Sequence, residues 1–195
     1  YGFYPLQVLG KKADLFHIVD QGYGHLIPFL PSGKTIVTVH DIISLVRWKG
    51  LIPNSQCEHK PVLAMQSFRL LNKAKHIIAV SQQTKNDLIN LLNISPEKIS
   101  VIYSGVDPIF RRFNDQEVKS FRQKWFPGMT EAKLVLLTGG QFYKNHEIAL
   151  KVISKVRRET GRDIRIVKTG YKDKHWDQWV EKNKLAECVF NLGLL

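Results

Sequence analysis

Apolar residues recur along the chain in two spacings, short continuous runs and runs that repeat every three or four positions. The short runs are typical of buried strands, and the spaced runs are typical of amphipathic helices. Strands are predicted at residues 14–19, 35–39, 76–80, 98–103, 134–138, 164–167 and near Val189. Helices are predicted after Pro61, after Ser81, after Asn114, at residues 145–158 and around Trp176 and Trp179. This alternation predicts an α/β fold with parallel sheets joined by crossover helices.

Signals at the helix ends divide this α/β pattern into two parts. Ser81 is a predicted N-cap, and Asn114 with Glu117 has the spacing of a capping box. Pro127 and Gly128 stop the second of these helices, and the strand–helix order then begins again. We therefore expect two units, residues 1–110 and 111–195. In the second unit, the helical spacing of four apolar residues predicts that they face the core: Ile148, Val152, Ile153 and Val156.

Ligands of open α/β sheets bind at the carboxyl ends of the strands. One loop in that position begins where the apolar run 134–138 breaks at Gly139 and Gly140. It carries Lys144, and the predicted helix starts at Asn145. Backbone N–H groups and the positive end of a helix dipole make such a turn a phosphate site, to which Lys144 adds a charge. The spacing matches neither a P-loop nor a dinucleotide fingerprint. An ordinary turn followed by a solvated lysine remains the alternative.

Two further loops follow strands of the first unit. His40 and Asp41 come directly after a buried strand, where a neutral histidine can exchange hydrogen bonds with a sugar hydroxyl or a phosphate oxygen. A histidine with structural partners and an Asp41 that caps the next segment are the alternatives. His25 ends a Gly-Tyr-Gly-His loop and could reach a polar ligand. The favoured alternative is that it belongs to a loop whose glycines only allow positive φ.

The chain has a formal net charge of +12, from 29 basic and 17 acidic residues. This balance favours anionic partners such as nucleotide phosphates, an anionic membrane surface or nucleic acid. A solvated basic face without a partner is the alternative. The charge is densest over a short stretch: Lys155, Arg157, Arg158, Arg162, Arg165 and Lys168.

Other classes of protein have little support in the sequence. No Asp-x-Asp pair and no His/Cys cluster has metal-ligand spacing, and Cys57 and Cys188 stand apart, so we expect no metal and no cofactor. No apolar run reaches the ~20 residues that span a bilayer. The chain starts at Tyr1 without a signal-peptide pattern, and we expect that it begins inside a longer, cytoplasmic protein.

Four segments, in order, resemble one known family: 38–42 (TVHDI), 74–85 (AKHIIAVSQQTK), 98–110 (KISVIYSGVDPIF) and 136–145 (LLTGGQFYKN). The series is similar to the retaining, nucleotide-sugar-dependent glycosyltransferases of family 4. The resemblance implies a GT-B architecture, in which two Rossmann-like domains face a cleft. Residues 1–110 would be the C-terminal portion of the acceptor-side domain, and 111–195 the first portion of the donor domain, so that both are incomplete.

The resemblance also assigns roles to residues. It implies that His40, with Asp41, faces the donor sugar as a catalytic group. It implies that the donor diphosphate is held by the glycine loop: Gly139, Gly140, Gln141, Lys144 and Asn145. Candidates on the acceptor side are Gln21, Gly24 and His25.

Two departures from the family pattern affect these roles. Family members often place an arginine just after the loop glycine, where this sequence has Gly140 or Gln141. The family's N-terminal glycine loop would lie before Tyr1, and its pair of glutamates eight residues apart beyond Leu195. We therefore expect the chain to be the central part of an enzyme and to be inactive alone.

The expected function is transfer of a sugar from a nucleotide-diphosphate sugar to an acceptor hydroxyl, with retention and without metal. The expected partners are the nucleotide sugar, a glycan or lipid-linked acceptor, and an anionic surface at the inner face of the cytoplasmic membrane, with no specific nucleic acid. The alternative is a non-catalytic basic α/β module that binds nucleic acid or another polyanion.

Overall fold

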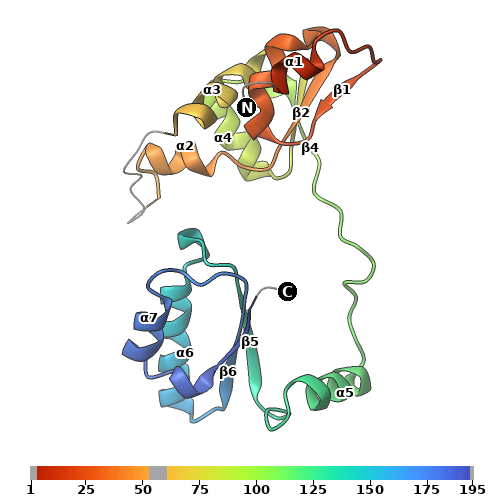
Figure 1. The fold of residues 1–195 in the computed structure, drawn as a ribbon. Coiled ribbons are helices and arrows are strands. Elements are labelled where there is room, and N and C mark those ends of the chain that lie inside the picture. Colours follow the sequence, from red (N-terminus) through yellow and green to blue (C-terminus); the bar gives the residue numbers. More distant parts are fainter. Residues whose placement is uncertain (1–3, 53–60, 194–195) are drawn as a thin grey trace. The chain divides into compact units, whose positions relative to one another are not determined.

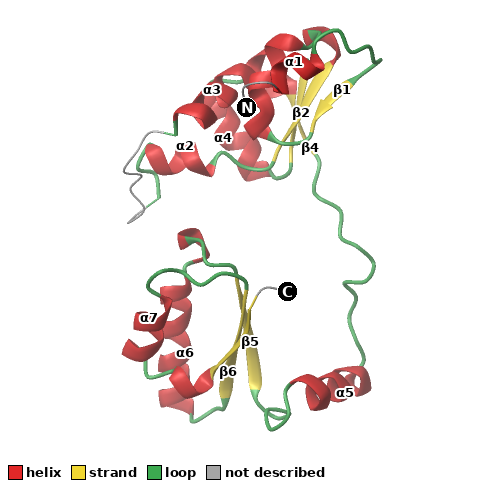
Figure 2. Cartoon of the chain, viewed as in Figure 1, coloured by secondary structure: helices red, strands yellow, loops and turns green. Residues whose placement is uncertain are grey.

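The computed structural model describes residues 4–52 and 61–193. The chain forms two compact units, Tyr1–Pro108 and Ile109–Leu195. Each unit alternates strands and helices and has a parallel sheet of its own (Figures 1 and 2). The predicted α/β, GT-B-type fold with two Rossmann-like units is thereby confirmed. No helix in the described part of the chain is long and apolar enough to cross a membrane.

The first unit contains a four-stranded parallel sheet in the order β1-β2-β3-β4. The strands are Phe16–Ile18, Thr35–Val39, His76–Ala79 and Ile99–Val101, shorter at several ends than the predicted runs. The α-helices α1 to α4 are Tyr4–Val8, Ile43–Trp48, Val62–Leu70 and Gln82–Leu92. Short 3-10 helices η2, η3 and η4 cover Ser32–Lys34, Leu71–Lys73 and Pro96–Lys98.

The segment after β1 differs from the prediction. Residues expected to form an irregular glycine loop form a run of 3-10 turns, η1, at Gln21–Phe29. Asp20 starts the run because its side chain accepts a hydrogen bond from the Gly22 amide. Gly24 is buried against α3, where an added Cβ would lie 2.5 Å from the Ser67 carbonyl oxygen. A glycine is therefore needed here for close packing and not for positive φ, so the φ-based interpretation of these glycines is wrong.

The second unit contains α5 (Asp115–Trp125) and a three-stranded parallel sheet in the order β5-β6-β7. The strands are Lys133–Thr138, Ile164–Thr169 and Val189–Gly193. Between them lie η5 (Phe142–Lys144), α6 (His146–Thr160), α7 (Trp176–Lys182) and η6 (Ala186–Cys188). The chain crosses from β5 to β6 and from β6 to β7 in the same direction along the sheet. The two crossover helices, α6 and α7, therefore cover the same face of the sheet (Figure 1).

The core of the second unit lies between that face and the two helices. Leu150, Ile153, Ile166 and Trp176 are among its buried members. The predicted inward stripe on α6 is only partly right. Ile153 is buried and Val156 packs against the core, but Ile148 and Val152 are 53% and 54% exposed. The buried stripe runs instead through His146, Leu150 and Ile153. Leu150 and Ile153 belong to one hydrophobic cluster with Ile166 of β6, and His146 meets Trp176 of α7.

Candidate functional site

The glycine loop at the carboxyl end of β5 is built from backbone contacts. Gly139 has φ +67°, a left-handed conformation that favours glycine, and its amide donates to the Thr169 carbonyl at 3.0 Å. Gly140 has no room for a side chain, since an added Cβ would lie 2.5 Å from the Tyr171 carbonyl oxygen. Gly170, also at positive φ, abuts Gly139. The loops after β5 and β6 are therefore interlocked through glycines.

The predicted polar residues of this loop gather over Gly139. The Gln141 side chain folds back toward it, with Oε1 2.6 Å from the position that a Cβ would take. The Lys144 Cε lies 3.9 Å from the same position. In the single turn η5, the Lys144 backbone amide donates to the Gln141 carbonyl at 2.9 Å, and this turn brings Lys144 back over the loop. The structure thus brings Gly139, Gly140, Gln141 and Lys144 together.

Helix α6 begins at this loop without a capping side chain. Asn145 is in the left-handed conformation and, in the part of the chain that the structure describes, makes no side-chain cap hydrogen bond. The first N–H groups of a helix have no partner within it. Helix α4 differs, because Ser81 accepts a hydrogen bond from the Thr84 amide. Donors at the start of α6 therefore adjoin the exposed Lys144 ammonium, which is an arrangement suited to an anion.

His146, the first residue of α6, was not among the predicted site residues. It is 5% exposed and its Nδ1 has no hydrogen-bond partner among the described residues. Its ring meets the Trp176 ring edge-on, with centroids 5.6 Å apart. Burial lowers the pKa of His146 and the nearby Lys168 charge lowers it further, so the neutral form is favoured. Nothing in the sequence around His146 indicated that its side chain would be buried.

The two residues predicted after β2 have different surroundings. His40 Nε2 is 3.0 Å from the Val19 carbonyl oxygen. Because a carbonyl only accepts, Nε2 carries the hydrogen and Nδ1 is left as the acceptor in the neutral ring. Asp41 Oδ1 accepts from the Ile43 amide at 3.0 Å, where α2 begins. Asp41 therefore has the local contact expected of a residue that fixes a helix start.

The candidate acceptor-side residues separate into two groups. Gln21 lies at His40, where its Oε1 accepts the His40 backbone hydrogen at 2.9 Å. Gly24 and His25 turn toward α3: His25 Nδ1 lies 3.1 Å from the Gly22 carbonyl oxygen and 3.5 Å from Ser67 Oγ. The structure thus brings Gln21 to His40 and gives Gly24 and His25 packing contacts with α3.

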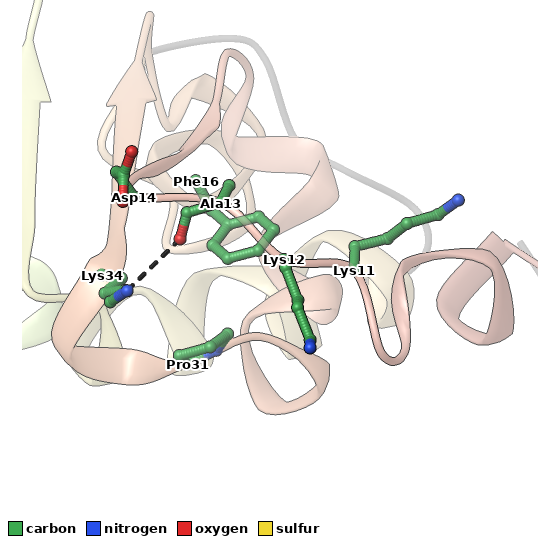
Figure 3. Close-up of a pocket in the computed structure, with 7 residues that line it drawn as sticks. All are labelled: Lys11, Lys12, Ala13, Asp14, Phe16, Pro31 and Lys34. Atoms are coloured by element: carbon green, nitrogen blue, oxygen red, sulfur yellow. Dashed lines mark hydrogen bonds between the residues drawn. The ribbon is translucent and has the colours of Figure 1, made fainter.

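A surface cavity of about 520 Å³ lies elsewhere in the first unit (Figure 3). It is at the amino ends of β1 and β2, opposite to the edge that carries His40. Lys34 Nζ reaches the Ala13 carbonyl oxygen there, at 3.4 Å, while Lys11 and Lys12 extend from the rim. None of the predicted site residues lines this cavity.

The dense basic stretch is not a uniform solvated face. Arg157 and Arg165 both pair with Asp163, and Arg165 also donates to the Glu187 carbonyl. Lys168, expected to be part of the exposed charge, is 1% exposed. Cys188 is a buried free thiol, and Cys57 lies outside the described residues. Within the described ranges, no group of three or more His, Cys, Asp or Glu side chains could hold a metal ion.

Comparison with solved structures shows what this fold resembles. The Anabaena protein Alr3699/HepE matches in three crystal structures. Its complex with UDP-glucose has TM-score 0.60 and 17% identity, over 83% of this chain and 42% of that one. Its complex with UDP and glucose has TM-score 0.59 and 17% identity, over 83% and 41%. Its complex with UDP has TM-score 0.59 and 18% identity, over 83% and 42%. The chain thus spans about two fifths of the length of these structures.

Comparison with sequences identifies the family. The search of curated proteins gives no match. The family model described as Glycosyltransferase Family 4 matches residues 5–110, more than half of the chain. This span includes β1 to β4 and the His40 loop described above. The chain belongs to glycosyltransferase family 4.

Proposed function

We propose that a protein containing this chain transfers a sugar from a nucleotide-diphosphate sugar to an acceptor hydroxyl. The transfer proceeds with retention and without metal. The observation that carries the proposal is the uncapped start of α6 beside Gly139, Gly140 and Lys144. In this proposal the donor diphosphate binds there. Asn145 and Gln141 complete its surroundings.

The mechanism follows from where charge develops. Breaking the bond between sugar and diphosphate leaves a nucleoside diphosphate, whose negative charge grows in the transition state. A helix N-terminus stabilises an anion by about 0.3–1 kcal/mol, and by up to ~2 when partly buried. A hydrogen bond from a charged group such as Lys144 adds roughly 1.5–3 kcal/mol. Because the helix start and the turn that carries Lys144 are in place before the reaction, they favour the transition state over the ground state.

We assign the donor sugar to His40. With Nε2 donating to Val19, Nδ1 is the ring atom available to accept a hydrogen bond from a sugar hydroxyl. Gln21 holds the His40 backbone, because its side-chain Oε1 accepts a hydrogen bond from the His40 N–H. Asp41 acts by fixing the start of α2, through Ile43. His40 is therefore the contacting group, and Gln21 and Asp41 are positioning residues.

The structural neighbours support a uridine nucleotide as the first donor to test. Alr3699/HepE was crystallised with UDP and with UDP-glucose. The acceptor we propose is a glycan or lipid-linked hydroxyl at an anionic membrane surface, which the formal charge of +12 would attract. Binding to vesicles that is independent of their anionic lipid content would remove the membrane from this proposal.

The decisive variant is Lys144→Ala in the full-length protein. We expect donor use, measured as kcat/KM for the nucleotide sugar, to fall roughly 10- to 100-fold, since each 1.4 kcal/mol is tenfold. Lys155→Ala is the matched control, because Lys155 is an exposed lysine of α6 whose Nζ lies 4.0 Å from Glu159 Oε1. Unchanged kinetics in Lys144→Ala would contradict the diphosphate assignment.

The competing hypothesis, a basic module that binds nucleic acid, predicts another pattern. Binding to an arbitrary oligonucleotide would fall steeply with salt, because counterions are released from the phosphates. Under this hypothesis, Lys144→Ala and Lys155→Ala would weaken oligonucleotide binding to the same extent. The enzymatic proposal requires instead that Lys144→Ala alone affects a nucleotide sugar.

A further inference from the structure

Lys168 is a lysine inside the second core. It lies on β6, is 1% exposed, and its Nζ is 5.5 Å from the centroid of the buried Trp176 ring. A charged side chain is almost never fully buried unless its donors are satisfied. Burial lowers the pKa of Lys168, and the nearby Lys172 lowers it further. Its position therefore needs a structural or functional reason.

The Lys168 ammonium donates to three consecutive backbone carbonyls of the loop that follows β6. The distances are 2.6 Å to the Thr169 oxygen, 3.4 Å to the Gly170 oxygen and 2.8 Å to the Tyr171 oxygen. The three donors of one ammonium thus hold a turn that contains a glycine at φ +72°. Without this ammonium, the turn would lose all three of these hydrogen bonds at once.

The loop held by Lys168 is the loop that fixes the candidate diphosphate site. The Thr169 carbonyl also accepts the Gly139 amide at 3.0 Å. The Tyr171 carbonyl closes the space beside Gly140, and the Gly139 backbone closes the space beside Gly170. Two of the three carbonyls that Lys168 binds are therefore in contact with the glycine backbone of the β5–α6 turn.

We propose that Lys168 is a positioning residue for donor binding: it sets the 169–171 loop, and through that loop the backbone of Gly139 and Gly140. The inference rests on the proposed function, which places the donor diphosphate at this turn. Lys168 is buried and does not touch the diphosphate. Its effect is on the geometry of the N–H groups and of Lys144 that do.

The test is Lys168→Met in the full-length protein, which keeps much of the side-chain volume and removes all three donors. The control is Lys172→Met, a more exposed lysine of the same loop whose side chain pairs with Asp177; its backbone lies next to Gly140 and is kept by the substitution. Binding of UDP, GDP, ADP and dTDP is measured by calorimetry. Amide hydrogen exchange at Gly139 and the melting temperature are measured on the same samples.

We expect Lys168→Met to weaken binding of the preferred nucleotide at least about 10-fold and to speed exchange of the Gly139 amide. Lys172→Met should do neither. A merely structural lysine would lower the melting temperature without changing affinity in the folded fraction. If Lys168→Met does not fold, Lys168→Gln, which keeps a shorter donor, takes its place.

The outcomes separate the two proposals. Wild-type protein that binds none of the four nucleotides overturns the proposed function. Wild-type protein that binds one of them, together with a folded Lys168 variant of equal affinity and equal Gly139 exchange, overturns only the role of Lys168.

Discussion

Position 140 of the glycine loop has no room for a side chain, and this limits where the loop can hold a positive charge. The family often has an arginine just after the loop glycine, and this chain could have been expected to tolerate one. The Tyr171 carbonyl occupies the space where any Cβ at this position would lie, 2.5 Å away. An arginine therefore has no room at position 140, and the cationic residue of the 139–145 loop is Lys144.

A second residue-scale consequence concerns His146 and pH. Its pKa in the folded protein is lowered, chiefly by burial and then by Lys168, while the Thr138 carbonyl and Asp173 oppose the shift and Lys144 adds to it. Below the ordinary histidine pKa near 6.5, the unfolded chain therefore binds the proton before the folded chain does. Stability should accordingly decrease as the pH falls through 6.5 toward the lower folded-state pKa.

His146→Asn should remove this part of the pH dependence. The measurement is the free energy of urea unfolding of the second unit, followed by Trp176 fluorescence, from about pH 7.5 to about pH 5.5, around the ordinary histidine value. The variant should show a smaller decrease than the wild type over this range. An identical decrease in both proteins would mean that other groups produce it.

Among the elements, α4, α5 and α6 begin in different ways. Ser81 caps α4, and Asn114 with Glu117 forms the predicted capping box at α5, with both hydrogen bonds present. Asn145 precedes α6 without a side-chain cap in the described structure. The start of α6 thus lacks a side-chain cap from Asn145, whereas Ser81 and Asn114 each accept an amide hydrogen at the start of α4 and α5.

This contrast predicts where a nucleotide will protect the backbone. Adding UDP at saturating concentration should slow hydrogen exchange in the first turn of α6, at residues 146–149. Exchange in the first turn of α4, at residues 82–85, is the internal control and should not change. Equal slowing at both helices would indicate general stabilisation, and no slowing at α6 would contradict binding at its N-terminus.

Elements were predictable from the sequence where their signals are local. Ser81 and Asn114 are examples, because each acts through neighbouring backbone atoms. The burial of Lys168 was not predictable, because its carbonyl partners and Trp176 come together only in the folded sheet. The exposed Ile148 and Val152 were missed for the same reason: periodicity identifies apolar positions on a helix but not the surface that covers them. Of the candidate site, the loops were predictable, and the contacts that fix them were not.

At the scale of the whole chain, two separate hydrophobic clusters correspond to the two units. Leu88 is fully buried in the first and Leu150 in the second. Among the described residues, no member is common to both clusters. Each unit therefore has its own source of stability, and local unfolding can differ between them.

Leu150→Ala should destabilise the second unit by about 2–5 kcal/mol, the usual cost of such a cavity. Native-state hydrogen exchange should then speed up in β5, β6 and β7 and stay unchanged in β1 to β4. Leu88→Ala is the reciprocal control and should show the opposite distribution. Equal acceleration in both units for either variant would show that they unfold as one.

The mutual contact of Gly139 and Gly140 with Gly170 and Tyr171 limits how this protein can be recombined with its relatives. A chimaera that imports only the β5–α6 turn from a homologue with a bulkier residue at position 140 would force that side chain into a backbone carbonyl. Importing only the turn after β6 would change the backbone carbonyls that Lys168 and the glycine turn contact. The turn after β5, the turn after β6 and position 168 should therefore be exchanged together. In evolution, substitutions in one of these two turns should appear alongside changes in the other.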